Sequence, residues 1–100
     1  MAESTGPIQV THNEPAHRFE VHEDGETAKL VYRREGDTIT FIHTGVPSGI
    51  GRHGVGSELV RTGLEYAKSQ GLKVIPLCPF AAAYIGSHPE YLHLVAEKSR

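Results

Sequence analysis

The stretch GIGRHGVGSELV, residues 49–60, decides the fold, because a glycine-rich segment turns there into a helical pattern. Four glycines fall within residues 49–56, and glycine lets a chain bend sharply or lets a ligand approach its backbone. The apolar residues that follow recur at helical spacing; they are Val55, Leu59, Val60, Leu64 and Ala67. The stretch therefore predicts a loop that opens a helix, and the free N–H groups from Gly51 to Ser57 suit an anion.

Two common nucleotide-binding motifs do not fit this loop. The spacing Gly49-x-Gly51-x-x-Gly54 matches a dinucleotide fingerprint, but Pro47 separates it from the preceding strand, and the next strand ends without an acidic residue. A nucleoside-triphosphate loop needs a Lys-Ser/Thr pair after Gly54, which the sequence lacks. Two interpretations remain, an anion site at a helix start or a mobile surface loop.

Alternating residues before the loop predict antiparallel strands. Ile8–Asn13 predicts a short strand, and residues 18–44 predict a three-stranded meander with turns at Asp24-Gly25 and Gly36-Asp37. In the third of these strands, strict alternation predicts one face with Ile39, Phe41 and His43 and another face with Thr38, Thr40, Ile42 and Thr44.

The residues after the helix complete an α+β fold. Leu72–Leu77 predicts an apolar strand, parallel to the strand that ends at Thr44 because a helix connects them. Pro76 has no N–H, so this strand lies at an edge or is unpaired on one side there. Residues 79–86 predict a short helix with Pro79 in its first turn, and residues 88–100 predict a second short helix or an irregular tail.

The bulk composition fits one globular domain, residues 8–100, behind a disordered tail at residues 1–7. The net charge of −2 gives no basic surface, so we expect no nucleic-acid partner. A long apolar run and a signal sequence are both absent, so we expect no membrane contact and a cytoplasmic location. The single cysteine excludes an internal disulfide, and the spacing of His12, His17 and His22 does not align them for a metal.

Four segments together resemble the GNAT superfamily of N-acetyltransferases, in particular its stand-alone members of about a hundred residues. They are FIHTGVP, GVGSELV, GLKVIPLCPFAAAYI and HPEYLHLV, which follow in this order within residues 19–95. Gly54 and Gly56 match the two small positions of the family's Arg/Gln-x-x-Gly-x-Gly/Ala motif. Gly51 stands at the first position of that motif, and Arg52 stands one place later.

The resemblance implies that the two parallel strands splay apart and that the pantetheine arm of acetyl-CoA enters the gap between them. It also implies that the pyrophosphate lies on the helix N-terminus and that an unidentified amine, small molecule or protein, accepts the acetyl group. The residues expected to bind acetyl-CoA or coenzyme A are Thr44, Val46, Gly51, Arg52, His53, Gly54, Val55, Gly56, Ser57 and Tyr84. The strands follow one another through short turns, so the helices that larger members insert are missing and the acceptor side should be open.

Two side chains are candidates for catalysis. Cys78 stands before Pro79 at a predicted N-cap, where a helix start stabilises a thiolate. Three roles are open for this cysteine: it acts as a nucleophile, it lines the thioester pocket, or it is a buried apolar residue. His43 suits a general base near neutral pH, although the apolar residues predicted on its face suit a core histidine equally well. Backbone N–H groups from Thr44 to Val46 are expected to polarise the carbonyl, and Tyr84 suits a general acid in the manner of the family.

Three functions follow from these observations. The first is acetyl-CoA-dependent acetylation of an amine, by direct attack or through an acetyl-Cys78. The second is a non-catalytic module that binds an acyl-CoA, which the missing acceptor-side helices favour. The third is a structural or interaction domain whose glycine loop only caps a helix. We expect a monomer or a weak homodimer.

Overall fold

The computed structural model describes residues 7–50 and 54–96. Within these ranges one sheet has the strand order β1-β2-β3-β4-β5; β1 to β4 are antiparallel, and β5 is parallel to β4. The strands are β1 Thr11–Asn13, β2 Arg18–Glu23, β3 Glu26–Glu35, β4 Thr38–Gly45 and β5 Lys73–Pro76. The helices are α1 Val55–Gln70 and α2 Pro79–Ser87, with short 3-10 turns η1 Glu14–Ala16, η2 Ser48–Ile50 and η3 Pro89–Leu94. The predicted α+β class is confirmed.

The two predicted hairpin turns are confirmed. Asp24 and Gly25 have φ angles of 52° and 77°, and Gly36 has a φ of 60°, which is the left-handed conformation that these residue types tolerate. These turns make β2, β3 and β4 a continuous meander, and β3 pairs with both of its sequence neighbours.

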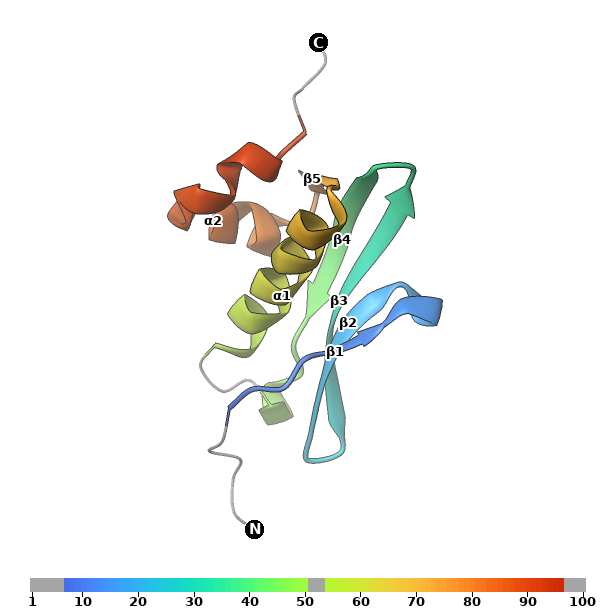
Figure 1. The fold of residues 1–100 in the computed structure, drawn as a ribbon. Helices are drawn as coiled ribbons and strands as arrows, with labels where there is room; N and C mark the ends of the chain where they lie inside the picture. The colour runs from blue at the N-terminus through green and yellow to red at the C-terminus, as the bar shows by residue number, and fades with distance from the viewer. Residues whose placement is uncertain (1–6, 51–53, 97–100) are drawn as a thin grey trace.

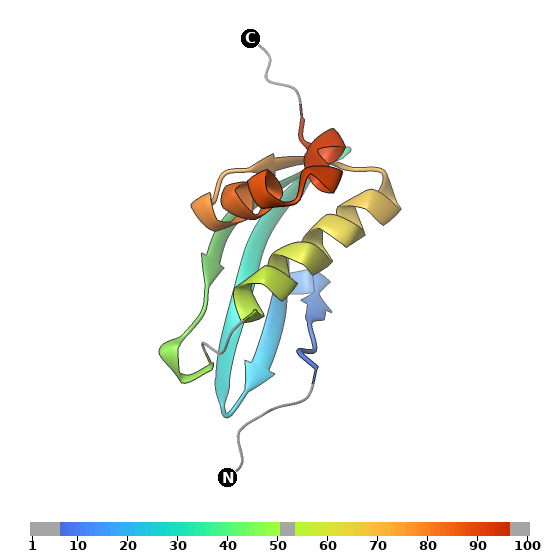
Figure 2. The ribbon, with the colours of Figure 1, turned by 90° about the vertical axis from the view of Figure 1, so that its left-hand side faces the viewer.

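Both α-helices cover the same face of the sheet, and the described residues place no helix on the other face (Figures 1 and 2). The residues of α1 that are buried against the sheet are the predicted apolar stripe together with Gly63. A Cβ at Gly63 would lie 3.0 Å from both Leu30 Cδ2 and Phe41 Cζ, so the absence of a side chain lets α1 approach the sheet closely. We refer below to the helix-covered face and the open face.

Two segments differ from the predicted boundaries. The first strand begins at Thr11 and not at Ile8, because Ile8 and Val10 pack against the hydrophobic core instead of extending the pairing with β2. Near the C-terminus, the predicted short helix is the 3-10 helix η3, after which Val95 forms a parallel bridge with Val74 of β5. The predicted tail falls mainly on residues 1–6, which lie outside the described residues.

An aromatic cluster on the helix-covered face of the sheet contains the half-buried side chain of His12. The imidazole stacks on Phe19 at a ring-centroid distance of 4.2 Å and meets the edge of Tyr66 at 4.5 Å. Its Nε2 lies 2.7 Å from the hydroxyl of Tyr32, which is 3% exposed. Burial lowers the pKa of His12, and the nearby Glu14 carboxylate only partly offsets this effect.

We expect the free energy of unfolding to fall as the pH drops below about 6.5, the ordinary value for histidine. The unfolded chain then binds a proton on His12 that the folded chain resists, and this loss levels off below the lowered pKa of the folded state. Urea unfolding of the wild type and of His12→Gln, measured between neutral pH and pH about 5, checks this. The glutamine variant should show a flatter pH dependence; an equal slope in the two proteins would contradict the assignment.

Candidate functional site

The two parallel strands separate at Phe41 and Pro76. Their pairing runs from Thr38 opposite Lys73 to Phe41 opposite Pro76, where the missing N–H of proline ends the ladder. The carbonyl oxygen of Phe41 then accepts two hydrogen bonds, one from the N–H of Leu77 at 3.1 Å and one from the N–H of Cys78 at 3.0 Å. Within the described residues, the rest of β4, residues 42–45, has no strand partner on the β5 side. The predicted splay is therefore present, and it leaves one main-chain edge of β4 free.

A β-bulge lies in β4 at the point of separation. The register changes between His43 opposite Val31 and Phe41 opposite Tyr32, which leaves Ile42 as an extra residue on β4. An extra residue reverses the alternation of side chains, so Phe41 and Thr44 both point to the helix-covered face. His43 lies on the open face. The prediction that His43 shares a face with Ile39 and Phe41, with Thr44 on the other face, is therefore wrong, because strict alternation allows no bulge.

Thr44 and Cys78 meet at the gap. The Thr44 Oγ1 lies 3.0 Å from the Cys78 Sγ, and the N–H of Ala81 donates to the same sulfur at 3.3 Å. Cys78 is the N-cap residue of α2, as predicted, and it is 3% exposed. The sulfur therefore lies on the first turn of α2, next to the free part of β4, with two hydrogen-bond donors available to it.

The first turn of α1 forms the second part of the site. Gly54 is the N-cap residue with a φ of 96°, and no side chain caps the helix there. The N–H groups at the start of an α-helix have no partner within the helix, so Val55, Gly56 and Ser57 present donors that an anion can use. Glu58 is the acidic residue of this turn, and Arg61 pairs with it at 3.0 Å. The predicted contacts of Gly51, Arg52 and His53 lie outside the described residues.

Gly56 has a packing role that the sequence did not reveal. A Cβ at this position would lie 2.9 Å from Phe80 Cζ, so the ring of Phe80 occupies the space that a side chain would need. Phe80 is 43% exposed and belongs to the first turn of α2. It therefore joins the start of α1 to the start of α2, which carries Cys78.

An open groove of about 220 Å³ continues from this contact along α2. It is lined by Ser57, Phe80, Ala83, Tyr84, Ser87 and His88. The ring of Tyr84 stacks on that of His88 at 3.9 Å, and burial raises the pKa of Tyr84 although Arg61 opposes this. Tyr84 follows Cys78 by six residues, which is about 9 Å along a helix axis. Ser57, Tyr84 and His88 thus lie together along this groove.

His43 and Cys78 lie on opposite faces of the sheet at the same gap. The side chain of His43 is exposed, which removes the interpretation of a core histidine. Val46, which follows β4, is 38% exposed. The site therefore has two sides: Thr44, Cys78 and the α1 start on the helix-covered face, and His43 on the open face.

A larger cavity, of about 490 Å³, lies far from this gap. It is lined by Thr38, Lys73, Leu92, His93, Val95 and Ala96, at the amino ends of β4 and β5. The candidate residues lie at the other end of these strands, so this cavity is not part of the site. In the described ranges, no helix is both long enough and apolar enough to cross a membrane.

Two comparisons bear on this geometry. The family model of the GCN5-related N-acetyl-transferases matches residues 18–94, which include every element from β2 to η3. The NMR solution structure of a GCN5-like protein from Staphylococcus aureus is also similar, with a TM-score of 0.71 and 26% sequence identity. The match covers 93% of this chain and 92% of the S. aureus chain. The likeness therefore extends over the whole fold.

Proposed function

Because the chain belongs to the GCN5-related N-acetyltransferase family, we propose that it transfers the acetyl group of acetyl-CoA to a primary amine. The observation that carries this proposal is the separation of β4 from β5 at Phe41 and Pro76, next to the start of α1, which no side chain caps, and the start of α2, which Cys78 caps. A gap with a free main-chain edge suits a narrow amide-containing arm, and a free helix start suits a pyrophosphate.

The residues present fit acetyl-CoA. At Gly54, an added Cβ would lie 3.6 Å from Ile8 Cδ1, which is an ordinary van der Waals contact, and the start of α1 has no side-chain cap that a ligand would have to displace. Ser57 and Tyr84 line the groove that continues from it, and Thr44 lies at the gap. When bound, acetyl-CoA supplies an activated acetyl group as a thioester. Arg52 and His53 are proposed to contribute positive charge at the phosphates.

In the proposed reaction, the two faces of the sheet at β4 have different roles. On the open face, His43 is proposed to accept a proton from the amine as its nitrogen bonds to the acetyl carbon. Backbone N–H groups from Thr44 to Val46 are proposed to stabilise the negative charge that develops on the carbonyl oxygen. The carbon–sulfur bond then breaks, and the thiolate departs on the helix-covered face beside Thr44 and Cys78.

Detection of acetylated products by mass spectrometry tests the proposal. The wild type is incubated with acetyl-CoA and a panel of small amines, polyamines and peptides, and a thermal melt with coenzyme A is recorded in parallel. We expect at least one acetylated amine and a raised melting temperature. A raised melting temperature without any acetylated amine would instead support a non-catalytic CoA-binding module. If no amine is acetylated and the melting temperature does not rise, both functions are contradicted.

Cys78 is expected to line the pocket and not to carry the acetyl group. Its sulfur is buried against Thr44 and Ala81, so alkylation near neutral pH should be slower than for a free thiol, and coenzyme A should slow it further. An exposed cysteine at a helix start would be alkylated fast, but Cys78 is buried, and we therefore expect slow alkylation. Cys78→Ala should keep most of the turnover.

A mass increase on the peptide that contains Cys78, after incubation with acetyl-CoA alone, decides between the two routes. We expect none, because a direct attack by the amine forms no acetyl-enzyme. An increase that disappears in Cys78→Ala, together with loss of turnover in that variant, would establish the acetyl-Cys78 route.

A further inference from the structure

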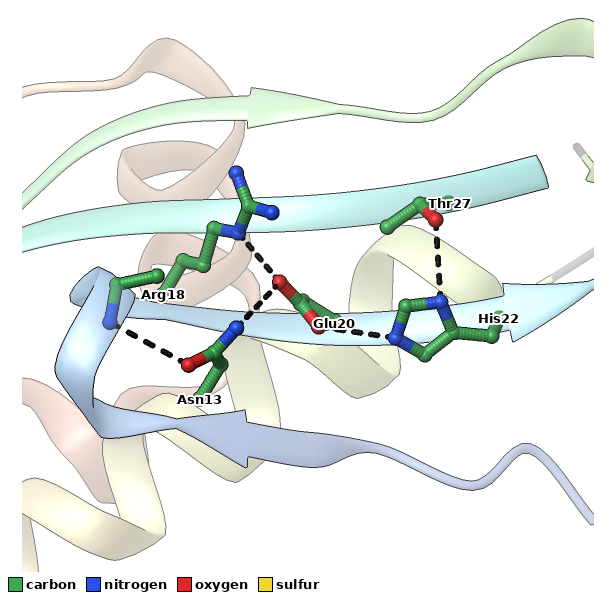
Figure 3. A network of polar contacts seen from close by, with 6 residues as sticks. Asn13, Arg18, Glu20, His22 and Thr27 are labelled. Atoms are coloured by element: carbon green, nitrogen blue, oxygen red, sulfur yellow. Dashed lines mark hydrogen bonds and ion pairs between the residues drawn. The ribbon is translucent and has the colours of Figure 1, made fainter.

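A polar network on the open face surrounds a carboxylate that no helix covers. Glu20 of β2 is 4% exposed, and it accepts hydrogen bonds from Asn13 Nδ2 at 3.0 Å, from His22 Nε2 at 2.9 Å and from Arg18 Nε (Figure 3). Burial alone would raise the pKa of Glu20, but the hydrogen bonds from Arg18, Asn13 and His22 lower it below its ordinary value. This carboxylate is therefore charged and fully occupied by its neighbours.

The hydrogen bond to Glu20 uses only one edge of the Arg18 guanidinium. Within the described residues, its NH1 and NH2 groups have no hydrogen-bond partner, and the side chain is 36% exposed. In Figure 3 the guanidinium extends from β2 over β3, away from the Glu20 backbone. Glu20 thus fixes the orientation of the guanidinium and leaves a pair of parallel donors free, which is the geometry that a carboxylate accepts.

Arg18 stands in the same row of the sheet as His43. Arg18 of β2 lies opposite Val31 of β3, and Val31 lies opposite His43 of β4. Neighbouring strands are about 4.8 Å apart, so two strand spacings, about 10 Å, separate the backbones of Arg18 and His43. The guanidinium covers part of that distance because it extends over β3. A small molecule above Val31 can therefore reach both side chains.

The charges of the open face also select against a polycation. Its basic strand residues are Arg18, Lys29, Arg33 and Lys73. Its acidic strand residues in the described ranges are Glu20, which is occupied as above, and Glu35, which lies 3.9 Å from Arg33. Glu35 is exposed, but it lies two rows of the sheet away from Val31, so beside Arg18 and His43 these strands offer no free carboxylate to a second ammonium group. The surface is complementary to a negative charge near the reacting amine.

We propose that Arg18 binds a carboxylate of the acceptor, and that the preferred acceptors are amines that carry a carboxylate a few atoms from the nitrogen. Glu20, Asn13 and His22 act as positioning residues for the guanidinium. This inference rests on the proposed function, because it takes the amine to be acetylated beside His43. The carboxylate at Arg18 then orients the amine, which lowers the cost of bringing the nitrogen to the acetyl carbon.

Matched pairs of amines that differ only in the carboxylate test this inference. The pairs are glycine with glycinamide, β-alanine with β-alaninamide, and γ-aminobutyrate with γ-aminobutyramide. For the best pair, we expect kcat/KM to be about tenfold higher, or more, for the acid than for the amide. Arg18→Gln should remove this preference by lowering kcat/KM for the acid to about the value for the amide, and the binding of coenzyme A should stay unchanged.

Arg33→Gln is the matched control, since it removes one positive charge from the same face, in the next row of the sheet. It should keep the preference for the acid. Arg18→Lys keeps the charge without the parallel donors, so it should restore only part of the preference. Because a glutamine at position 18 could disturb the fold, the NMR signal of the Arg18 Nε–H in the wild type, saturated with coenzyme A, is also followed on addition of γ-aminobutyrate. A shift with γ-aminobutyrate and none with γ-aminobutyramide supports the site.

Two outcomes would overturn the inference separately from the proposed function. Equal kcat/KM for acids and amides, with both acetylated, would leave the transferase and remove the role of Arg18. A preference for acids that survives in Arg18→Gln would place the carboxylate site elsewhere. If no amine of either kind is acetylated, the proposed function fails and this inference falls with it.

Discussion

Replacing His43 by alanine is expected to lower kcat for acetyl transfer by about a hundredfold or more, while the affinity for coenzyme A stays unchanged. The β-bulge at Ile42 turns His43 to the open face, where no helix covers it, and the strand edge that follows is free of β5. In the proposed mechanism the imidazole acts on the amine and not on the thioester sulfur. Loss of a general base slows the chemical step without weakening the binding of the acetyl donor.

Steady-state kinetics with the best acceptor found by mass spectrometry, together with coenzyme A titrations, measure both effects. His93→Ala is a matched control, because His93 is an exposed histidine that lines the cavity at the other end of β5. It should leave kcat unchanged. A His43→Ala variant with nearly normal kcat would show that the amine loses its proton to water or to another group.

Replacing Gly54 by valine is expected to abolish the stabilisation that coenzyme A gives to the folded protein. A ligand at a hundredfold excess over its Kd stabilises the folded state by about 2.7 kcal/mol, and this gain should disappear. Gly54 has a φ of 96°, a conformation that a β-branched residue avoids, so valine would change the backbone that presents the first N–H groups of α1. Its side chain would also stand where the phosphates are proposed to bind.

The strain of valine at a positive φ destabilises the protein by itself, so a control with the same strain is needed. Gly71 ends the same helix with a φ of 69°, and a Cβ there would meet no atom within 4 Å. Gly71→Val should lower the melting temperature of the free protein but keep the full increase with coenzyme A. If Gly54→Val kept that increase too, the pyrophosphate would not lie at the start of α1.

The elements that depend on local chemistry could be predicted from the sequence. The apolar stripe of α1, the hairpin turns and the N-cap position of Cys78 each follow from residue types at fixed spacing, and all are present. The end of the parallel pairing at Pro76 also follows, because proline lacks the N–H that the ladder needs.

The two-sided arrangement of the site could not be predicted in this way. A bulge is a mismatch between two strands, so the pattern of β4 alone could not show that Ile42 is an extra residue. For that reason His43 was predicted on the core face and Thr44 on the other. The contact between Gly56 and Phe80 was also hidden, since it joins residues of two helices whose packing the sequence pattern does not give.

A crystal structure of the protein with bound coenzyme A tests the account most directly. We predict that the pyrophosphate lies on the N–H groups of Val55, Gly56 and Ser57, and that the pantetheine arm lies along residues 42–45 of β4. The thiol should end between Thr44 and Cys78 on one side and His43 on the other. Coenzyme A bound in the cavity beside Thr38 and Lys73, with the gap after Phe41 and Pro76 still empty, would contradict it.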